Sequence, residues 1–157
     1  MGDNLTEQFL GDPATWDAVA LLLWSVQPLW GGQIISIAGS GATIVRRIGP
    51  GARQEQRYET ALDREEVAAM LRLLIAHDLL AVELSTGGLL VPDETEIIIT
   101  VRKGRRAFTL STWATDSADV RVSTIIEVLR GPDRCAESLT PLYDGPYDGG
   151  RSGFGRI

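Results

Sequence analysis

Two short runs rich in β-branched residues, 33–38 and 42–48, are separated only by Gly39, Ser40 and Gly41. Runs of this kind joined by glycines, which adopt positive φ without steric cost, are typical of a β-hairpin. Because the strands of a hairpin are antiparallel, this stretch predicts a fold built on an antiparallel sheet.

The same glycines could instead belong to a phosphate-binding loop. A dinucleotide-binding motif requires a third glycine where Ile44 stands, followed by a helix whose amides face the pyrophosphate. Here the next residues predict another strand, and the chain has no G-x-x-x-x-G-K-[ST] motif. We therefore expect a turn at this position and no cofactor.

A helix is predicted to begin at Asp63, after a loop over residues 49–60. Asp63 and Glu66 have the spacing of a capping box, in which each side chain accepts a hydrogen bond from the other residue's backbone. The apolar residues that follow recur at helical spacing and predict a face that packs on the sheet: Val67, Met70, Leu71 and Leu74.

A second hairpin is predicted over residues 97–110. With Lys103 and Gly104 as a two-residue loop, Ile99 faces Phe108 and Arg102 faces Arg105, a like-charge pair. The face that holds Ile99 is then mostly apolar and the other face is polar, which predicts a sheet buried on one side only.

The two ends of the chain differ in pattern. Asp12 and Pro13 predict a brief helical turn before a strand over residues 18–26, and a last helix is predicted from Val122, Ile125, Ile126 and Leu129. Residues 133–157 are rich in glycine and proline and have neither helical nor strand periodicity. We expect one domain over residues 1–132 and a C-terminal arm over residues 133–157.

These patterns together predict an α+β fold. We expect an antiparallel sheet of about four or five strands, with one or two helices packed on one face.

Charge and cysteine content restrict the partners and the compartment. With 15 basic and 21 acidic residues the formal net charge is −6, which opposes nucleic-acid binding. Cys135 is the only cysteine and His77 the only histidine, so neither an intramolecular disulfide nor a Cys/His zinc site is expected. The N-terminal sequence lacks the pattern of a signal peptide, and the apolar run 18–24 is too short to span a membrane. We expect a cytoplasmic protein that neither binds nor crosses a membrane.

Candidate catalytic groups are few. His77 stands at the expected end of a helix without a predicted nucleophile beside it, and Cys135 has only Arg134 next to it to lower its pKa. The carboxylates within residues 93–96 lack the spacing of an EF-hand. We predict no catalytic residue, no metal site and no cofactor, and hence a protein that is not an enzyme.

Candidate partner-binding residues fall in three places. The first is Trp30, in a loop beside two glycines. An exposed tryptophan there would be an interface anchor, whereas the more common alternative is a tryptophan that covers the core. The second is the basic hairpin tip, whose like charges require an acidic group nearby, either one of the chain's own carboxylates, which we favour, or an acidic patch of a partner. The third is the apolar residues of the arm. The residues of these two groups are Arg102, Lys103, Arg105 and Arg106, and Tyr143, Tyr147, Phe154 and Ile157.

The order of these elements over about residues 21–130 resembles the layout of the emfourin-type bacterial proteins. The resemblance is carried by the acidic-capped helix after a glycine-containing loop, the Pro92-Asp93 pair before the second hairpin, and the short closing helix. Emfourin-type proteins are small inhibitors of thermolysin-like metalloproteases, so the resemblance implies an inhibitory binding protein. It identifies no inhibitory residue.

The sequence therefore predicts a non-enzymatic domain that binds a protein partner through loops, hairpin tips and arm. One alternative is an inhibitor or immunity-type protein that blocks a partner enzyme. Another is a structural subunit held in an assembly, including a homo-oligomer, through residues 143–157.

Overall fold

The computed structural model describes residues 3–82, 95–113 and 120–147. The helical elements are α1 (Leu5–Leu10), η1 (Pro13–Ala18), η2 (Pro50–Ala52), α2 (Arg64–Ala76), η3 (Leu79–Ala81), α3 (Val120–Leu129) and α4 (Gly131–Ala136). The strands are β1 (Val19–Gln27), β2 (Gly31–Ala38), β3 (Ala42–Ile48), β4 (Gln54–Ala61), β5 (Glu96–Lys103), β6 (Arg106–Trp113) and β7 (Tyr143–Pro146).

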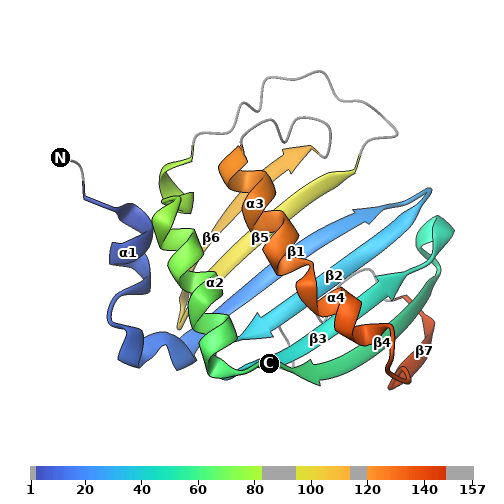
Figure 1. The fold of residues 1–157 in the computed structure, drawn as a ribbon. Helices are drawn as coiled ribbons and strands as arrows, with labels where there is room; N and C mark the ends of the chain where they lie inside the picture. Colours follow the sequence, from blue (N-terminus) through green and yellow to red (C-terminus); the bar gives the residue numbers. More distant parts are fainter. Residues whose placement is uncertain (1–2, 83–94, 114–119, 148–157) are drawn as a thin grey trace.

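All seven strands of the described residues form one antiparallel sheet in the order β6-β5-β1-β2-β3-β4-β7. Strands β1 to β4 are consecutive neighbours, and β5 and β6 form a separate hairpin that joins them beside β1 (Figure 1). The predicted α+β class with an antiparallel sheet is confirmed, but the sheet is larger than the four or five strands expected.

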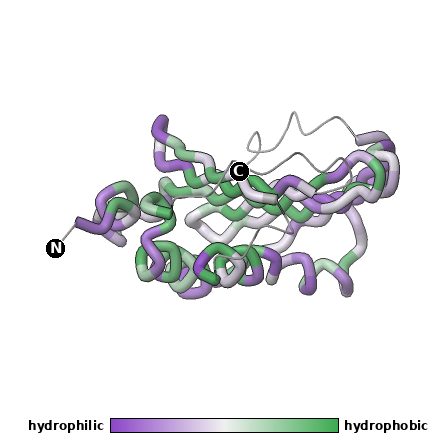
Figure 2. Tube along the Cα trace, turned by 90° about the horizontal axis from the view of Figure 1, so that it is seen from above, coloured by the Kyte–Doolittle hydropathy of each residue, from purple (hydrophilic) through white to green (hydrophobic). Residues whose placement is uncertain are grey.

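The helices α2, α3 and α4 lie in one layer along one face of the sheet (Figures 1 and 2). The main core is between these layers, where Leu21 and Leu23 of β1 meet Leu71 and Leu74 of α2 and Ile125 of α3, all at most 1% exposed. Burial of these side chains is the main favourable term in folding.

Several predicted elements are confirmed. The N-terminal segment forms the short helical turn η1 and then β1, and β2 and β3 form the first hairpin. Helix α2 begins after Asp63 with the predicted capping box, in which the Asp63 N–H donates to Glu66 Oε2 at 3.3 Å. The apolar positions of the last helix are all buried: Val122, Ile125, Ile126 and Leu129.

The loop predicted over residues 49–60 is wrong, because most of it is β4. Strand β4 lacks an alternation of apolar residues, since its face away from the helices carries Glu55, which is 1% exposed and paired with Arg46. Its helix-side face carries Tyr58 beside hydrophilic Gln56. A charged residue buried through an ion pair gives no hydrophobic signal in the sequence.

The prediction that the residues after 132 form neither helix nor strand is also wrong. Residues 131–136 form α4, and β7 pairs with β4 along the sheet edge, with Arg57 opposite Tyr143. The Gly145-Pro146 pair in β7 suits a short edge strand better than a central one. The division of the chain at residue 132 stays a prediction.

The second hairpin forms with a different register. Its loop is Gly104–Arg105, so Lys103 faces Arg106, Val101 faces Phe108 and Ile99 faces Leu110. Gly104 has φ +60°, and a glycine at the first loop position is typical of a type II′ turn. The predicted Arg102–Arg105 pair is therefore wrong: Arg102 faces Ala107.

The expectation of a sheet buried on one side only is wrong as well. On the face away from the helices, Val26, Ile34 and Ile48 form a second buried cluster against which Trp24 and Tyr147 pack. Residues on this face of the central strands are thus removed from water even though no described helix covers them.

Helix α1 is fastened to the end of α2 by Asp78. The Asp78 carboxylate accepts hydrogen bonds from Thr6 N and Thr6 Oγ1, both at 2.9 Å, and from Leu5 N at 3.3 Å. Burial raises the pKa of this carboxyl, but the hydrogen bonds from Thr6 and Leu5 lower it by more, so the pKa lies below its ordinary value.

We predict that Asp78→Asn lowers the free energy of unfolding at neutral pH by about 1–3 kcal/mol, because charge-assisted hydrogen bonds are lost. A carboxyl whose pKa is depressed by folding stabilises fully above its unfolded pKa of about 3.9, and this contribution is lost as pH falls through the folded pKa. Urea denaturation from about pH 6 to about pH 2 should therefore show a weaker pH dependence for Asp78→Asn than for the wild type.

The control is Asp17→Asn, because the contact that Asp17 makes among the described residues is an exposed ion pair with Arg64 at 3.6 Å. It should leave stability nearly unchanged. Equal pH dependence in the wild type and Asp78→Asn would contradict the assignment.

Candidate protein-binding surface

The loop between β1 and β2 presents two large apolar side chains to solvent. Trp30 is 67% exposed and Leu29 is 56% exposed. The side chain of Gln27, which is 4% exposed, stabilises the loop. Its Oε1 accepts hydrogen bonds from Leu29 N and, at 3.1 Å, from Trp30 N. The apolar tip formed by Leu29 and Trp30 is therefore displayed on a backbone held by hydrogen bonds.

A second loop supports this tip. Gly51 N, in the β3–β4 connection, donates to Leu29 O at 3.3 Å. Gly31 has φ +80°, and a Cβ built on it would lie 2.1 Å from Ile48 O. Only glycine allows this close approach of the two connections. The position of the apolar tip therefore depends on Gly31.

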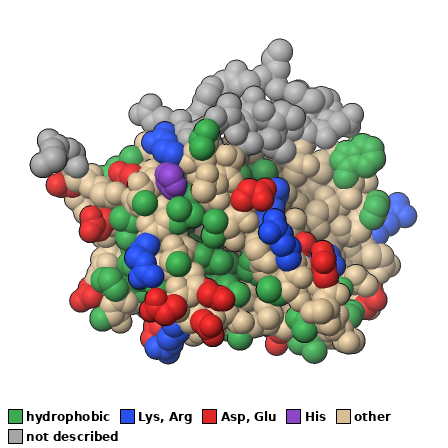
Figure 3. Space-filling view, in the orientation of Figure 1, with side chains coloured by type: hydrophobic (Ala, Val, Ile, Leu, Met, Phe, Trp, Pro, Cys, Tyr) green, Lys and Arg blue, Asp and Glu red, His purple; other side chains and the backbone are tan. Residues whose placement is uncertain are grey.

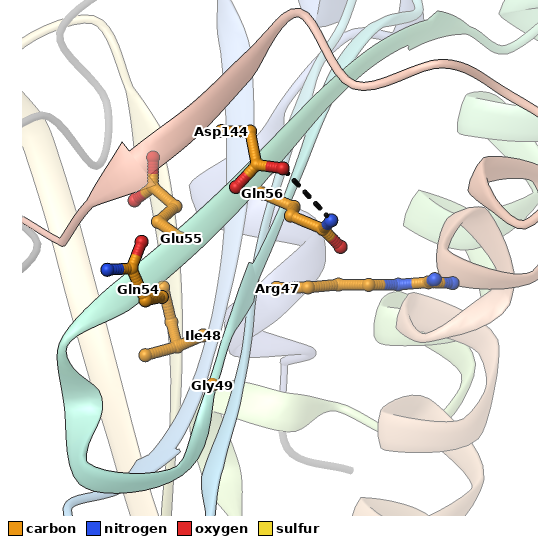
Figure 4. Close-up of a pocket in the computed structure, with 7 residues that line it drawn as sticks. All are labelled: Arg47, Ile48, Gly49, Gln54, Glu55, Gln56 and Asp144. Atoms are coloured by element: carbon orange, nitrogen blue, oxygen red, sulfur yellow. Dashed lines mark hydrogen bonds between the residues drawn. The ribbon is translucent and has the colours of Figure 1, made fainter.

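A cavity of about 240 Å³ lies beside these loops, where β3, β4 and β7 meet (Figure 4). Its lining residues are Arg47, Ile48, Gly49, Gln54, Glu55, Gln56 and Asp144. Figure 4 shows Arg47 extending from β3 toward α4, while Gln56 Nε2 meets Asp144 Oδ2 at 3.4 Å.

The charged groups of this cavity are engaged with one another or with their neighbours. Arg47 Nε donates to Asp133 Oδ1 at 2.7 Å, and this hydrogen bond raises the pKa of Arg47 more than burial lowers it. Glu55 accepts from Arg46 Nε at 2.7 Å and from Arg57 Nη2 at 2.7 Å. These pairs join β3 to α4 and to β4. They indicate a structural role for Arg47 and Glu55.

A second cavity, of about 280 Å³, lies between η1 and α2. Trp16, Val67 and Leu71 contribute buried apolar groups to its lining. Its charged lining residues pair among themselves, Arg64 with Asp17 at 3.6 Å and Arg72 with Glu65 at 3.5 Å.

The structure does not bring the predicted partner-binding residues together. Val19 at the start of β1 faces Lys103, whereas the apolar tip follows the end of β1, so the basic hairpin and Trp30 occupy opposite ends of the sheet. Tyr147 lies at the Trp30 end, because its N–H donates to Arg53 O beside the β3–β4 connection. Phe154 and Ile157 lie outside the described residues.

The four basic residues of the hairpin have separate surroundings. Lys103 Nζ donates to Leu10 O and, at 2.7 Å, to Thr15 Oγ1, and the Arg106 guanidinium stacks 5.3 Å from the Phe9 ring centroid. Arg102 is half-buried and Arg105 is exposed. On the helix-covered face, acidic and basic side chains are interspersed and no single sign dominates (Figure 3).

The two described aromatic residues of the arm, Tyr143 and Tyr147, already contact arginine side chains of the same chain. The Arg57 guanidinium lies 5.1 Å from the Tyr143 ring centroid, and Arg46 lies 5.7 Å from that of Tyr147. Tyr143 is 37% exposed and its hydroxyl donates to Pro146 O at 2.6 Å. These two side chains therefore pack on the sheet of their own chain.

The other candidate groups have ordinary surroundings. His77 is the half-buried C-cap of α2, and Cys135 is exposed on α4. Residues 93–94 lie outside the described part of the chain. Among the described residues no group of His, Cys, Asp or Glu is placed to hold a metal ion, and no helix is long and apolar enough to cross a membrane.

Sequence reasoning found Trp30 but missed the residues that hold it. The role of Gln27 and the contact of Gly31 with Ile48 could be recognised only from the register of β1, β2 and β3. The stretch Gln27–Gly32 did contain a signal, since paired glycines after a tryptophan indicate a turn with unusual φ.

Comparison of the chain with protein-family models, with curated proteins and with solved structures finds no match. The resemblance to emfourin-type inhibitors therefore stays a prediction.

We predict that Gly31→Ala destabilises the protein more than Gly51→Ala. The two glycines have nearly the same positive φ, +80° and +79°, which costs an L-residue about 1–2 kcal/mol. At Gly51 a Cβ meets only the Arg53 side chain at 3.9 Å, whereas at Gly31 it overlaps the backbone. The additional loss at Gly31 should reach at least about 1 kcal/mol in urea denaturation. Equal losses would show that the two connections can move apart without cost.

Proposed function

We propose that this chain is a non-enzymatic protein-binding domain that inserts the apolar tip, Leu29 and Trp30, into an apolar pocket of a protein partner. The observation that carries the proposal is the exposure of Trp30 on a backbone held by the buried Gln27. A large aromatic side chain presented in an ordered loop loses little conformational entropy on binding, which is why tryptophan is enriched in interface hot spots.

The tip is preferred over the arm as the binding element. Tyr143 and Tyr147 already contact Arg57 and Arg46 of their own chain, so a partner would have to displace those contacts. Trp30 has no comparable ring contact among the described residues. A structural subunit held through residues 143–157 is therefore the weaker alternative.

An inhibitor of a partner enzyme is the second candidate function. The favouring observation is that the loop carrying the tip is joined to the β3–β4 connection by the Gly51–Leu29 hydrogen bond, which favours preorganisation. Inhibitors that enter an enzyme's cleft gain affinity from loops preorganised in this way. A bacterial metalloprotease is the class of target that the resemblance to emfourin-type proteins implies.

The test places a photo-crosslinking amino acid at position 30 in cells of the native host. The matched control is position 142, because Leu142 is also 67% exposed. We expect a discrete adduct from position 30 only, identified by mass spectrometry and then purified for binding and enzyme assays. Equal labelling from both positions would contradict the proposal.

With the partner in hand, Trp30→Ala should weaken binding by about 30-fold or more, the effect of losing a hot-spot residue of about 2 kcal/mol. Leu142→Ala should leave the Kd within about twofold, since most interface-remote residues contribute little. Isothermal titration calorimetry measures both. A Trp30→Ala variant that binds as tightly as the wild type would overturn the proposal, and loss of partner activity on binding would favour the inhibitor.

A further inference from the structure

The two edges of the sheet are protected to different degrees. Strand β7 is four residues long and contains Asp144 and Pro146, two features with which natural proteins prevent edge-to-edge association. Strand β6 is eight residues long, pairs with β5 in a continuous register without a bulge, contains no proline, and has no charged residue after Arg106. Within the described part of the chain, the β6 edge therefore lacks the usual protection against strand addition.

The backbone groups at this edge can be assigned from the hairpin register. Because the loop has two residues, its closing pair Lys103–Arg106 exchanges backbone hydrogen bonds, and such pairs alternate along an antiparallel ladder. The N–H and C=O groups of Ala107, Thr109 and Ser111 consequently point away from β5. No described residue pairs with these groups, and Ala107 and Thr109 are exposed.

The apolar side chains of β6 are only partly covered. Phe108 and Leu110 pack against the main core on the helix side of the sheet, yet both are half-buried. The Phe9 ring meets Phe108 edge-on, with centroids 5.3 Å apart. A further strand beside β6 would cover the outer sides of Phe108 and Leu110 and extend the core.

We propose that β6 pairs antiparallel with β6 of a second copy of this chain, about a two-fold axis at Thr109, so that the two sheets become continuous. This dimer is independent of the proposed partner binding through the apolar tip.

A second copy is the occupant because the sequence of β6 is self-complementary in this register. A two-fold axis through Thr109 places Thr109 opposite itself and Phe108 opposite Leu110 twice, and aromatic–aliphatic and Thr–Thr pairs stabilise antiparallel strands. The outward backbone groups of Ala107 then meet those of Ser111 in the other copy, as the ladder requires. No like charges face each other, since Arg106 lies opposite Thr112.

The test measures the mass of the full chain by sedimentation equilibrium over increasing concentration. We expect the weight-average mass to rise from the 17.0 kDa of one chain toward twice that value. Thr109→Pro removes an N–H that β5 does not use, so it should leave a folded monomer at the same concentrations. Thr109→Val keeps the N–H and the β-branched shape and should still dimerise. Circular dichroism checks that each variant is folded.

A charge exchange tests the axis itself. Thr109→Lys and Thr109→Glu should each be monomeric, because each places like charges opposite one another, whereas an equimolar mixture should form a mixed dimer. In a Cys135→Ser background, Thr109→Cys should oxidise to a disulfide-linked dimer, since residues opposite each other in a hydrogen-bonded pair lie about 5.5 Å apart between Cα atoms.

A wild-type protein that stays monomeric throughout would overturn the proposal and leave the edge to a strand of another protein. A Thr109→Pro variant that dimerises like the wild type would overturn it by placing the interface elsewhere. Trp30→Ala should not alter self-association, so failure of the dimer and failure of the proposed partner binding are separate outcomes.

Discussion

The antiparallel pairing of β1 with β5, from Val19 opposite Lys103 to Trp24 opposite Ile98, joins two parts of the sheet that are far apart in the sequence. Strands β1 to β4 form consecutive antiparallel pairs, and β5 and β6 form a local hairpin, so each part could pair without the other. Only this pairing places Ile97, Ile99 and Val101 beside β1 under the helices. The loop-closure entropy that this distant contact costs is offset when apolar side chains of both parts are buried in the same core under the helices.

The parts of the fold that could be predicted are those with local signals. The capping box at Asp63, the helical spacing from Val122 to Leu129 and the glycines between β2 and β3 each specify an element within a few residues. Strand β4 could not be predicted in this way, because the burial of Glu55 depends on its ion pair with Arg46 of the neighbouring strand β3. The predicted loop of the second hairpin began one residue too early, so each predicted partner on β6 was two positions too early. The turn type depends on which loop position the glycine takes.

The candidate site was predictable only in part, for the same reason. A tryptophan beside two glycines was visible in the sequence, but its exposure and its support by Gln27 and by the β3–β4 connection depend on strands brought together in space. The basic cluster at residues 102–106 looked like one surface in the sequence. In the sheet, adjacent residues point to opposite faces, so Arg102 lies on one side and Lys103 on the other.

Lys103 is the only lysine in the chain, all other basic side chains being arginine. Its ammonium group donates to Leu10 O and Thr15 Oγ1, so it ties the β5–β6 hairpin to the end of α1 and to η1. In the folded chain the one ε-amino group is thus hydrogen-bonded to the N-terminal segment. A reagent that acylates side-chain amines would therefore react at Lys103 alone. Its reaction rate would report how often the N-terminal segment separates from the β5–β6 hairpin.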